Sequence, residues 1–485
     1  MMNFIYVVWL IFNGLLLLFV CHELFLLIHA LIRKNKVTQI KVLSTNLPKV
    51  TIQLPLYNEK YVVERLLTSA AMVNYPSDLL EIQVLDDSTD ETSEIIRDFI
   101  STHKNGQLFT HIQRTDRTGF KAGALAYGLN LAKGEFVAVF DADFVIDPNF
   151  VRAVIPWFED KKVGVVQTKW THLNENFSML TRAQALMLNT HFSIEQLGRS
   201  EAKSFINFNG TAGIWRKTCI IDAGGWQADT LTEDLDLSYR AQIRGWKFEY
   251  LFGIAAPSEL PVTFEAYKTQ QYRWSKGAAE CVRKNWQLLW HSKIGVKEKI
   301  LGSFHLLNSS VYLLIIPIII LSPIVYYGMS NYMINLDDLL KFRHLGIATT
   351  SALILIFFMG NLIGQKNPLS NIIWFIPVIF FFFAMTSGIS LYMLIGVLEG
   401  YFKKATEFVR TPKFGDDQTV KSKIKGGYDF KKEINLKLFE LIFLLYGIGV
   451  IVTSFFEMNL PMGIYGAILT LGFSLAVFFN KKTFA

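Results

Sequence analysis

The sequence predicts an α/β domain with a mostly parallel sheet, joined to an α-helical membrane region. Three observations lead to this prediction. Hydrophobic residues make up 51% of the 485 residues and charged residues only 18%, against roughly 25% charged in a soluble globular chain. Long apolar stretches lie near both ends of the sequence. Between them, short apolar runs alternate with helical patterns, as in proteins with parallel sheets.

The first expected element is a membrane-spanning helix within residues 1–36. The stretch from Asn3 to Ile32 is almost wholly apolar and ends in Arg33-Lys34-Asn35-Lys36. Such a stretch is long enough to cross a bilayer, too long for a signal-peptide core, and has no A-x-A site. Because basic residues mark the cytosolic end of a span, the domain that follows is expected to be cytosolic.

Residues 45–276 form the predicted α/β domain. Five apolar runs predict strands, and three helical patterns begin near Lys60, Asp90 and Gly119. The predicted strands are Val50–Leu54, Glu81–Leu85, Leu108–Ile112, Glu135–Phe140 and Val163–Thr168. No G-x-G-x-x-G or Walker lysine loop occurs, which argues against a dinucleotide-binding or P-loop protein.

Polar residues follow the predicted strands, where open parallel sheets bind their ligands. Tyr57-Asn58-Glu59 follows the first strand and Asp86-Asp87 the second. These two acids could accept hydrogen bonds from a nucleoside, or could equally cap a helix. Asp141 and Asp143 follow the fourth strand and share one face, where they could hold a hard divalent cation together with a diphosphate. Taken alone, a D-x-D pair is usually a solvated loop.

Three further groups could bind an anion or a sugar. Lys121 lies where a helix begins, which suits a phosphate, although a surface lysine would look the same. Thr232-Glu233-Asp234-Leu235-Asp236 is a second acidic cluster, which could also be an N-cap run. Gln270-Gln271-Tyr272-Arg273-Trp274 offers an aromatic face and hydrogen-bond donors, although the tryptophan could simply pack at a membrane edge.

Residues 277–300 are expected to form an interfacial amphipathic helix. Val282, Trp286, Leu289 and Trp290 share one helical face, with basic residues elsewhere. A soluble surface helix is the alternative. Residues 301–485 then form the predicted C-terminal transmembrane region, with apolar stretches at 304–327, 345–364, 372–398, 436–456 and 462–480.

The loop 401–435 is expected to be cytosolic. The segment from Tyr401 to Lys437 carries ten Lys and Arg residues against five acids, and such excess is typical of the inner side. Three spans before this loop would place it outside. One of them is therefore expected to lie in the interface or to re-enter, and 372–398, interrupted by Pro377 and Gly388, is the candidate. The basic residues behind the net charge of +7 thus lie mostly beside the membrane, so nucleic acid is not an expected partner.

The ordered set DD, D-x-D, T-E-D and Q-Q-x-R-W resembles the family 2 glycosyltransferases, in particular the membrane-embedded cellulose synthase superfamily. The similarity covers about Val50 to Ile300. Four strings most resemble the plant cellulose synthase-like proteins that make mannan, glucomannan or xyloglucan backbones. They are Gln83–Asp90, Gly119–Leu125, Phe208–Gly213 and Gln270–Ser275.

The resemblance implies a Rossmann-like GT-A catalytic domain and assigns roles to residues. Asp234 would be the general base, with Glu233 beside it in the catalytic pair. Asp141 and Asp143 would hold Mg²⁺ or Mn²⁺. The implied donor or nucleotide contacts are Glu59, Asp86, Asp87, Lys121, Asp141, Thr411 and Lys413. The implied acceptor or diphosphate contacts are Asn209, Gly210, Thr211, Gln270, Arg273 and Trp274. Thr411 and Lys413 come from a string that resembles the gating-loop pattern F-x-V-T-x-K, in which Val409 stands one place early.

The expected function is an inverting, metal-dependent transfer of a hexose from a nucleotide sugar, of UDP-glucose or GDP-mannose type, to a growing β-linked polysaccharide. Export could be coupled to synthesis. The protein would be a multi-pass membrane protein, in the plasma or inner membrane if bacterial, and the sequence identifies no accessory subunits. The alternative is a non-processive enzyme with a lipid acceptor, such as ceramide, diacylglycerol or a polyprenyl phosphate. The Q-Q-x-R-W string favours the polysaccharide. A hydrolase fits less well, because nothing singles out a general acid paired with a nucleophile.

Overall fold

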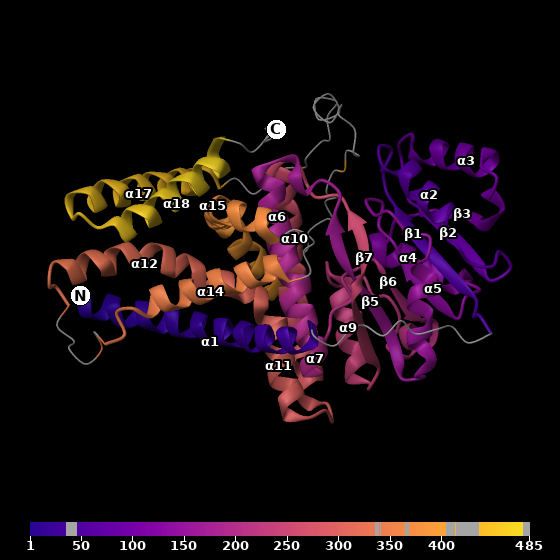
Figure 1. Ribbon diagram of the computed structural model, residues 1–485, viewed down its shortest axis with the longest axis horizontal. Coiled ribbons are helices and arrows are strands. Elements are labelled where there is room, and N and C mark those ends of the chain that lie inside the picture. Colours follow the sequence, from indigo (N-terminus) through magenta and orange to yellow (C-terminus); the bar gives the residue numbers. More distant parts are fainter. Residues whose placement is uncertain are drawn as a thin grey trace.

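The protein consists of an α/β domain and a bundle of long apolar helices. The structure is a computed structural model that describes residues 1–34, 46–334, 339, 341–363, 368–403, 413 and 436–478. Figure 1 shows the sheet at one end and the long helices side by side at the other. Helices α6 (Met179–Thr190) and α10 (Phe264–His291) lie between the two parts and run across the direction of the bundle.

The α/β domain is built on a seven-stranded sheet with the order β3-β2-β1-β4-β6-β5-β7. The strands are β1 (Val50–Leu56), β2 (Leu80–Asp86), β3 (Phe109–Gln113), β4 (Phe136–Val139), β5 (Val163–His172), β6 (Gly213–Arg216) and β7 (Lys247–Ser258). Only β6 runs antiparallel to its neighbours, β4 and β5. The predicted mostly parallel sheet is confirmed. The five predicted strands correspond to β1–β5, whereas β6 and β7 were not predicted.

Helices cover both faces of the sheet, because its strands are apolar on both sides. The helices α2 (Val63–Ala71), α3 (Thr92–Thr102) and α5 (Phe150–Val154) share one core with the strands. The second core holds α4 (Phe120–Leu131), α8 (Lys217–Asp222) and α9 (Glu233–Ile243). It also includes Val20 and Leu26 of α1 (Met2–Lys34), so apolar packing fastens the domain to the first long helix.

Six helices of the described chain are long and apolar enough to cross a membrane. Their apolar spans are Met2–Ile32, Val296–Ser330, Leu345–Leu362, Ile372–Tyr401, Lys437–Phe456 and Leu460–Phe478. The corresponding elements after α1 are α11 (Val296–Leu306), α12 (Tyr312–Ser330), α14 (Leu345–Leu362), α15 (Pro368–Tyr401), α17 (Lys437–Phe456) and α18 (Leu460–Phe478). The remaining helical elements are η1 (Gly106–Leu108), η2 (Ile155–Glu159), η3 (Glu175–Phe177), η4 (His191–Gln196), α7 (Leu197–Ala202) and η5 (Leu307–Val311).

The helix expected over 277–300 has other bounds in the structure, while its interfacial position stays a prediction. Helix α10 begins earlier and ends at His291, and a short turn separates it from α11. Val282 and Leu289 of α10 are buried against Leu235 and Tyr239 of α9. Much of the apolar face expected to lie on lipid therefore packs against the α/β domain.

The stretch 372–398 is not interrupted, contrary to expectation. Helix α15 continues through Pro377 as a single helix of 34 residues. Gly388 lies where α15 crosses α18, and a Cβ added to it would stand 2.2 Å from the carbonyl oxygen of Gly472. The glycine therefore permits a close helix crossing rather than a break. The expected cytosolic loop 401–435 lies almost wholly outside the described residues.

This crossing predicts that Gly388→Val destabilises the protein. The added side chain meets the α18 backbone, and overpacking of this kind costs about 1–3 kcal/mol. Gly449→Val is the matched control, because Gly449 has nothing within 4 Å of an added Cβ. In detergent, we expect a lower midpoint of thermal unfolding for Gly388→Val only. Equal midpoints for the two variants would contradict this packing.

Candidate active site

A cavity of about 620 Å³ opens beyond the carboxyl ends of β1, β2 and β4. The sheet order places β2 and β4 on opposite sides of β1, and open α/β sheets bind ligands at such a reversal of strand order. Tyr57, Glu59, Asp87 and Asp141 line the cavity from these strand ends. From there it extends past α9 and α10 to α12 and α14.

The two neighbouring acids at the end of β2 have different surroundings. Asp86 is buried, and its carboxylate accepts hydrogen bonds from Ser88 N (2.9 Å), Ser93 Oγ (2.6 Å) and His111 Nε2 (2.9 Å). Burial raises the pKa of Asp86, but the bonds from His111, Ser93 and Ser88 outweigh this effect and lower it to about 2. The Asp86 side chain therefore ties β2 to its neighbours, and only Asp87 of this pair lines the cavity.

Asp87 is hydrogen-bonded to Arg114, an arginine that the sequence analysis did not identify. Nε of Arg114 lies 2.9 Å from Oδ1 of Asp87, and Nη2 donates to the other carboxylate oxygen. A second arginine, Arg117, places its guanidinium carbon 3.3 Å from the ring centroid of Tyr57. Arg114 directly follows β3, so the strand-end rule that singled out Asp87 could have found it too.

Arg273 of α10 lines the same cavity as four carboxylates. Burial lowers the pKa of Arg273, while the charges of Glu233, Asp141, Asp234 and Asp143 act in the opposite direction. Gln270 and Trp274, on the same helix, also line the cavity. The structure thus brings together the acidic motifs of β4 and α9 and the Q-Q-x-R-W string.

Each carboxylate of the D-x-D pair has a lysine ammonium beside it. Nζ of Lys121 lies 2.6 Å from Oδ1 of Asp141 and donates to the carbonyl oxygen of Gly210 at 2.9 Å. Nζ of Lys413, a buried residue, lies 2.6 Å from Oδ2 of Asp143. These lysines neutralise the two acids. The other residue expected from this loop, Thr411, lies outside the described residues.

The D-x-D pair also fits a divalent cation. The described residues contain no group of three or more His, Cys, Asp or Glu side chains that could hold a metal. Two carboxylates are nevertheless enough for Mg²⁺ or Mn²⁺ when phosphate oxygens of a ligand complete the shell. Lys121 and Lys413 lie against these carboxylates, so a divalent cation at Asp141 and Asp143 would have to take carboxylate oxygens from the two ammonium groups.

Asp234 has the surroundings of a proton acceptor. Burial and then the charge of Glu233 raise the pKa of Asp234 to about 7, while Lys121 opposes them. Burial likewise raises the pKa of Glu233. A carboxylate with a pKa near neutrality is suited to general base catalysis. Gly210 has φ +80°, and a Cβ there would lie 3.0 Å from Oδ2 of Asp234, so this glycine lets the backbone approach the acid.

The loop Asn209-Gly210-Thr211 connects the D-x-D pair to η4, which is a π-helix. Oγ1 of Thr211 accepts a hydrogen bond from the backbone N of Asp141 at 2.9 Å. Oδ1 of Asn209 accepts one from Nε2 of Gln196 at 2.5 Å. Asn209 and Gly210 line the cavity, whereas Thr211 lies behind them.

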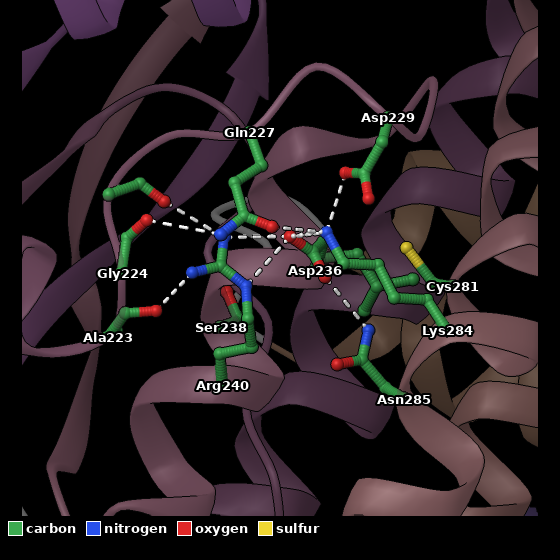
Figure 2. A network of polar contacts seen from close by, with 12 residues as sticks. Ala223, Gly224, Gln227, Asp229, Asp236, Ser238, Arg240, Cys281, Lys284 and Asn285 are labelled. Atoms are coloured by element: carbon green, nitrogen blue, oxygen red, sulfur yellow. Dashed lines mark hydrogen bonds and ion pairs between the residues drawn. The ribbon is translucent and has the colours of Figure 1, made fainter.

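A buried ion network joins α9 to α10 (Figure 2). Asp236 is fully buried and accepts hydrogen bonds from three side chains. The donors are Arg240 (Nε 2.9 Å, Nη2 2.7 Å), Lys284 (Nζ 3.0 Å) and Asn285 (Nδ2 3.0 Å). Lys284 also contacts Gln227 and Asp229, from the loop before α9. Since α9 carries Asp234 and α10 carries Arg273, this network sets their relative positions.

Comparison with known proteins shows that the chain is similar in sequence to sugar transferases. A family model described as "Glycosyltransferase like family 2" matches residues 48–277. Glucomannan 4-beta-mannosyltransferase 2 of Arabidopsis thaliana is 35% identical over 405 residues, which cover 79% of this chain and 71% of the relative. Glucomannan 4-beta-mannosyltransferase 1 of Oryza sativa subsp. japonica is 35% identical over 401 residues, or 78% of this chain and 72% of the relative.

The fold is also similar to that of a solved structure. The mannosyltransferase PcManGT from Pyrobaculum calidifontis, in complex with GDP-Man and Mn²⁺, superposes with a TM-score of 0.56 and 19% identity. The match covers 81% of this chain and 100% of that one. It confirms the expected GT-A architecture of the α/β domain.

The Asp236 network predicts a large stability cost for Asp236→Asn. The change leaves Arg240 and Lys284 buried without their shared carboxylate, and breaking a buried ion pair costs about 3–5 kcal/mol. Asp222→Asn is the control, because the ion pair of Asp222 with Arg244 is exposed and such pairs contribute up to about 1 kcal/mol. Thermal unfolding of both variants checks this. A cost for Asp236→Asn no larger than that for Asp222→Asn would contradict the proposed role of the network.

Proposed function

The chain belongs to glycosyltransferase family 2, in its cellulose synthase-like group, and is a hexosyltransferase; we propose that it extends a β-linked polysaccharide with mannose from GDP-mannose. The main support for this proposal is that Asp141, Asp143, Asp234 and Arg273 line one cavity. The names of its relatives, and the GDP-Man and Mn²⁺ bound by PcManGT, support the choice of donor and cation.

We assign the strand-end part of the cavity to the donor. Tyr57, Asp87 and Arg117 offer an aromatic ring, a carboxylate and a guanidinium to the nucleoside, with Glu59 nearby in the lining. The diphosphate would lie between Lys121 and the D-x-D pair. Mg²⁺ or Mn²⁺, held by Asp141 and Asp143, would neutralise charge on the leaving diphosphate.

In the proposed transfer, Asp234 takes the proton from an acceptor hydroxyl. The hydroxyl oxygen attacks the anomeric carbon from the side opposite the nucleotide, and the bond from that carbon to the diphosphate oxygen breaks. The configuration at the carbon therefore inverts. Lys121 and Arg273 stabilise the charge that develops on the leaving group, because they are already in place before the reaction. Glu233 keeps the pKa of Asp234 high enough for the proton transfer.

The shape of the cavity supports a polysaccharide product. Its lining continues from Asp234 and Trp274 to Tyr312 and Ile315 of α12 and to Phe357 of α14. A growing chain could leave the site directly into the helical region, which would couple synthesis to export. The catalytic domain would then face the cytosol, where nucleotide sugars are made. The same apolar end could instead admit a lipid acceptor, which is the second candidate function.

Product analysis separates these two functions. Membranes carrying the protein are given Mn²⁺ with radiolabelled GDP-mannose or UDP-glucose, and the products are extracted with organic solvent. We expect label from GDP-mannose in an insoluble polymer that an endo-mannanase degrades. Label in the organic phase would overturn the polysaccharide proposal in favour of a glycolipid.

The general-base role predicts that Asp234→Asn lowers kcat by about 10²–10⁴-fold and leaves GDP-mannose binding nearly intact. The wild-type rate should also rise with pH through about 7, because only the ionised carboxylate can accept a proton. Asp98→Asn, an exposed acid on α3, is the control for loss of a carboxylate. Steady-state kinetics of the wild type and both variants measure these effects. An Asp234→Asn variant with more than about a tenth of the wild-type kcat would refute the general-base role.

The cation role predicts that Asp143→Asn removes the effect of Mn²⁺ on GDP affinity. In the wild type, Mn²⁺ should strengthen GDP binding, since the cation joins the carboxylates to the diphosphate. Asp147→Asn, four residues on and exposed, should keep this effect. Calorimetric titration of GDP with and without Mn²⁺ measures it. An unchanged Mn²⁺ dependence in Asp143→Asn would exclude this residue as a ligand.

A further inference from the structure

The middle residue of the Q-Q-x-R-W string contacts a long apolar helix. The other four residues of the string line the cavity, whereas the hydroxyl of Tyr272 donates a hydrogen bond to Oε2 of Glu399 on α15. Helix α15 packs against α10 at this point. Burial and then the bond to Glu399 raise the pKa of Tyr272, so the hydroxyl keeps its proton and remains a donor. The proposed reaction gives neither residue a role.

Glu399 also contacts the next turn of α10. Nζ of the fully buried Lys276 lies 3.3 Å from the same oxygen of Glu399. Because Tyr272 and Lys276 are four residues apart, they are neighbours on one face of the helix. Arg273 and Trp274 lie between them in the sequence. One carboxylate oxygen of α15 therefore contacts both ends of the helical turn that carries these two cavity residues.

Close packing of the two helices makes this contact possible. A Cβ added to Gly396 would stand 2.9 Å from Cδ2 of Tyr272, and one added to Gly400 would stand 2.6 Å from the carbonyl oxygen of Lys276. Nη1 of Arg283 donates to the carbonyl oxygen of Gly400 at 2.5 Å. Two glycines four residues apart allow two helices to approach closely, so the end of α15 lies directly on the backbone of α10.

Burial of this carboxylate has a cost that stability alone does not explain. Glu399 is buried within an otherwise apolar helix. An ionisable group in such a helix is expensive and commonly marks a function. Replacing a buried ion pair by apolar side chains is often neutral or stabilising, and buried ionic groups can serve specificity instead. What the contact supplies is direction, since a hydrogen bond fixes the rotation of the turn that donates it.

The Asp236 network holds α10 at a more distant place. Its α10 members, Lys284 and Asn285, begin eleven residues after Arg273, which is about 16 Å along a helix. Displacing a reacting group by about 1 Å can cost about a hundredfold in rate. A contact on the same turn constrains Arg273 much more directly than one at this distance.

We propose that Glu399 is a positioning residue for the sugar transfer, which acts through Tyr272 to orient Arg273. The inference rests on the proposed function, because it takes Arg273 as a group that stabilises the leaving diphosphate. This charge develops in the transition state. Loss of the orientation therefore lowers kcat and kcat/KM together and leaves the KM for GDP-mannose unchanged.

Tyr272→Phe is the first test, because it removes the hydroxyl, keeps the ring and leaves Lys276 beside Glu399. The full-length protein in nanodiscs is assayed with GDP-mannose and Mn²⁺. We expect kcat to fall by about ten- to a hundredfold, as for a displaced catalytic group. The KM for GDP-mannose and the affinity for GDP should stay at their wild-type values.

Tyr446→Phe is the matched control. The hydroxyl of Tyr446 on α17 donates to the carbonyl oxygen of Ile320 on α12 at 2.6 Å, so it also links two long helices, but Tyr446 does not line the cavity. This variant should keep the wild-type kcat. A contact that serves stability alone would lower the midpoint of thermal unfolding and leave kcat as it is.

Glu399→Asp tests the other side of the contact. It keeps a carboxylate beside Lys276 but withdraws it from Tyr272 by one methylene group, and kcat should fall as in Tyr272→Phe. Because both changes break one contact, the double variant should be no slower than the slower single variant. Losses that multiply in the double variant would contradict positioning through Tyr272.

Arg273→Gln separates the two possible failures. If this variant keeps the wild-type kcat, the role proposed for Arg273 is wrong and the inference falls with it. If Arg273→Gln is slow but Tyr272→Phe has the kcat of Tyr446→Phe, the proposed function stands and the positioning role of Glu399 is overturned.

Discussion

The balance of charge in the cavity is the constraint on which the rest of the structure depends. Two carboxylates that follow β4 and two on α9 line one cavity together with Arg273 of α10, and like charges gathered in this way stay ionised only when positive groups compensate them. Lys121, Arg273 and Lys413 supply that compensation from three separate parts of the chain. A cation and a diphosphate would enter a site in which charges of both signs are already arranged.

Buried contacts hold these parts in place. The Asp236 network joins α9 to α10 (Figure 2), and a second ion pair joins α10 to the membrane helices, with Nζ of the fully buried Lys276 3.3 Å from Oε2 of Glu399 on α15. The sheet core continues into α1 through Val20 and Leu26. The residues proposed for catalysis are therefore fixed relative to the long helices, as the proposed delivery of the product into the helical region would require.

Much of the fold and of the site could be predicted, because the signals are local. Strand periodicity and the polar residues that end each strand located β1–β5, Asp87 and the D-x-D pair. Features that depend on distant partners could not be predicted. β6 has only four residues and owes its place to β4 and β5, and Pro377 lies inside an unbroken helix. The pairing of Arg114 with Asp87 and the π-helix at His191 appear only in three dimensions.

A structure of the protein with GDP and Mn²⁺ would show whether the D-x-D pair is the donor site. We expect Mn²⁺ bound by the carboxylates of Asp141 and Asp143 and by the diphosphate, with Lys121 and Arg273 facing the phosphates and Asp234 open to the acceptor side. It would be contradicted if GDP and Mn²⁺ bound elsewhere while Lys121 and Lys413 stayed on the two carboxylates. In that case the D-x-D pair would be a structural ion cluster rather than the donor site.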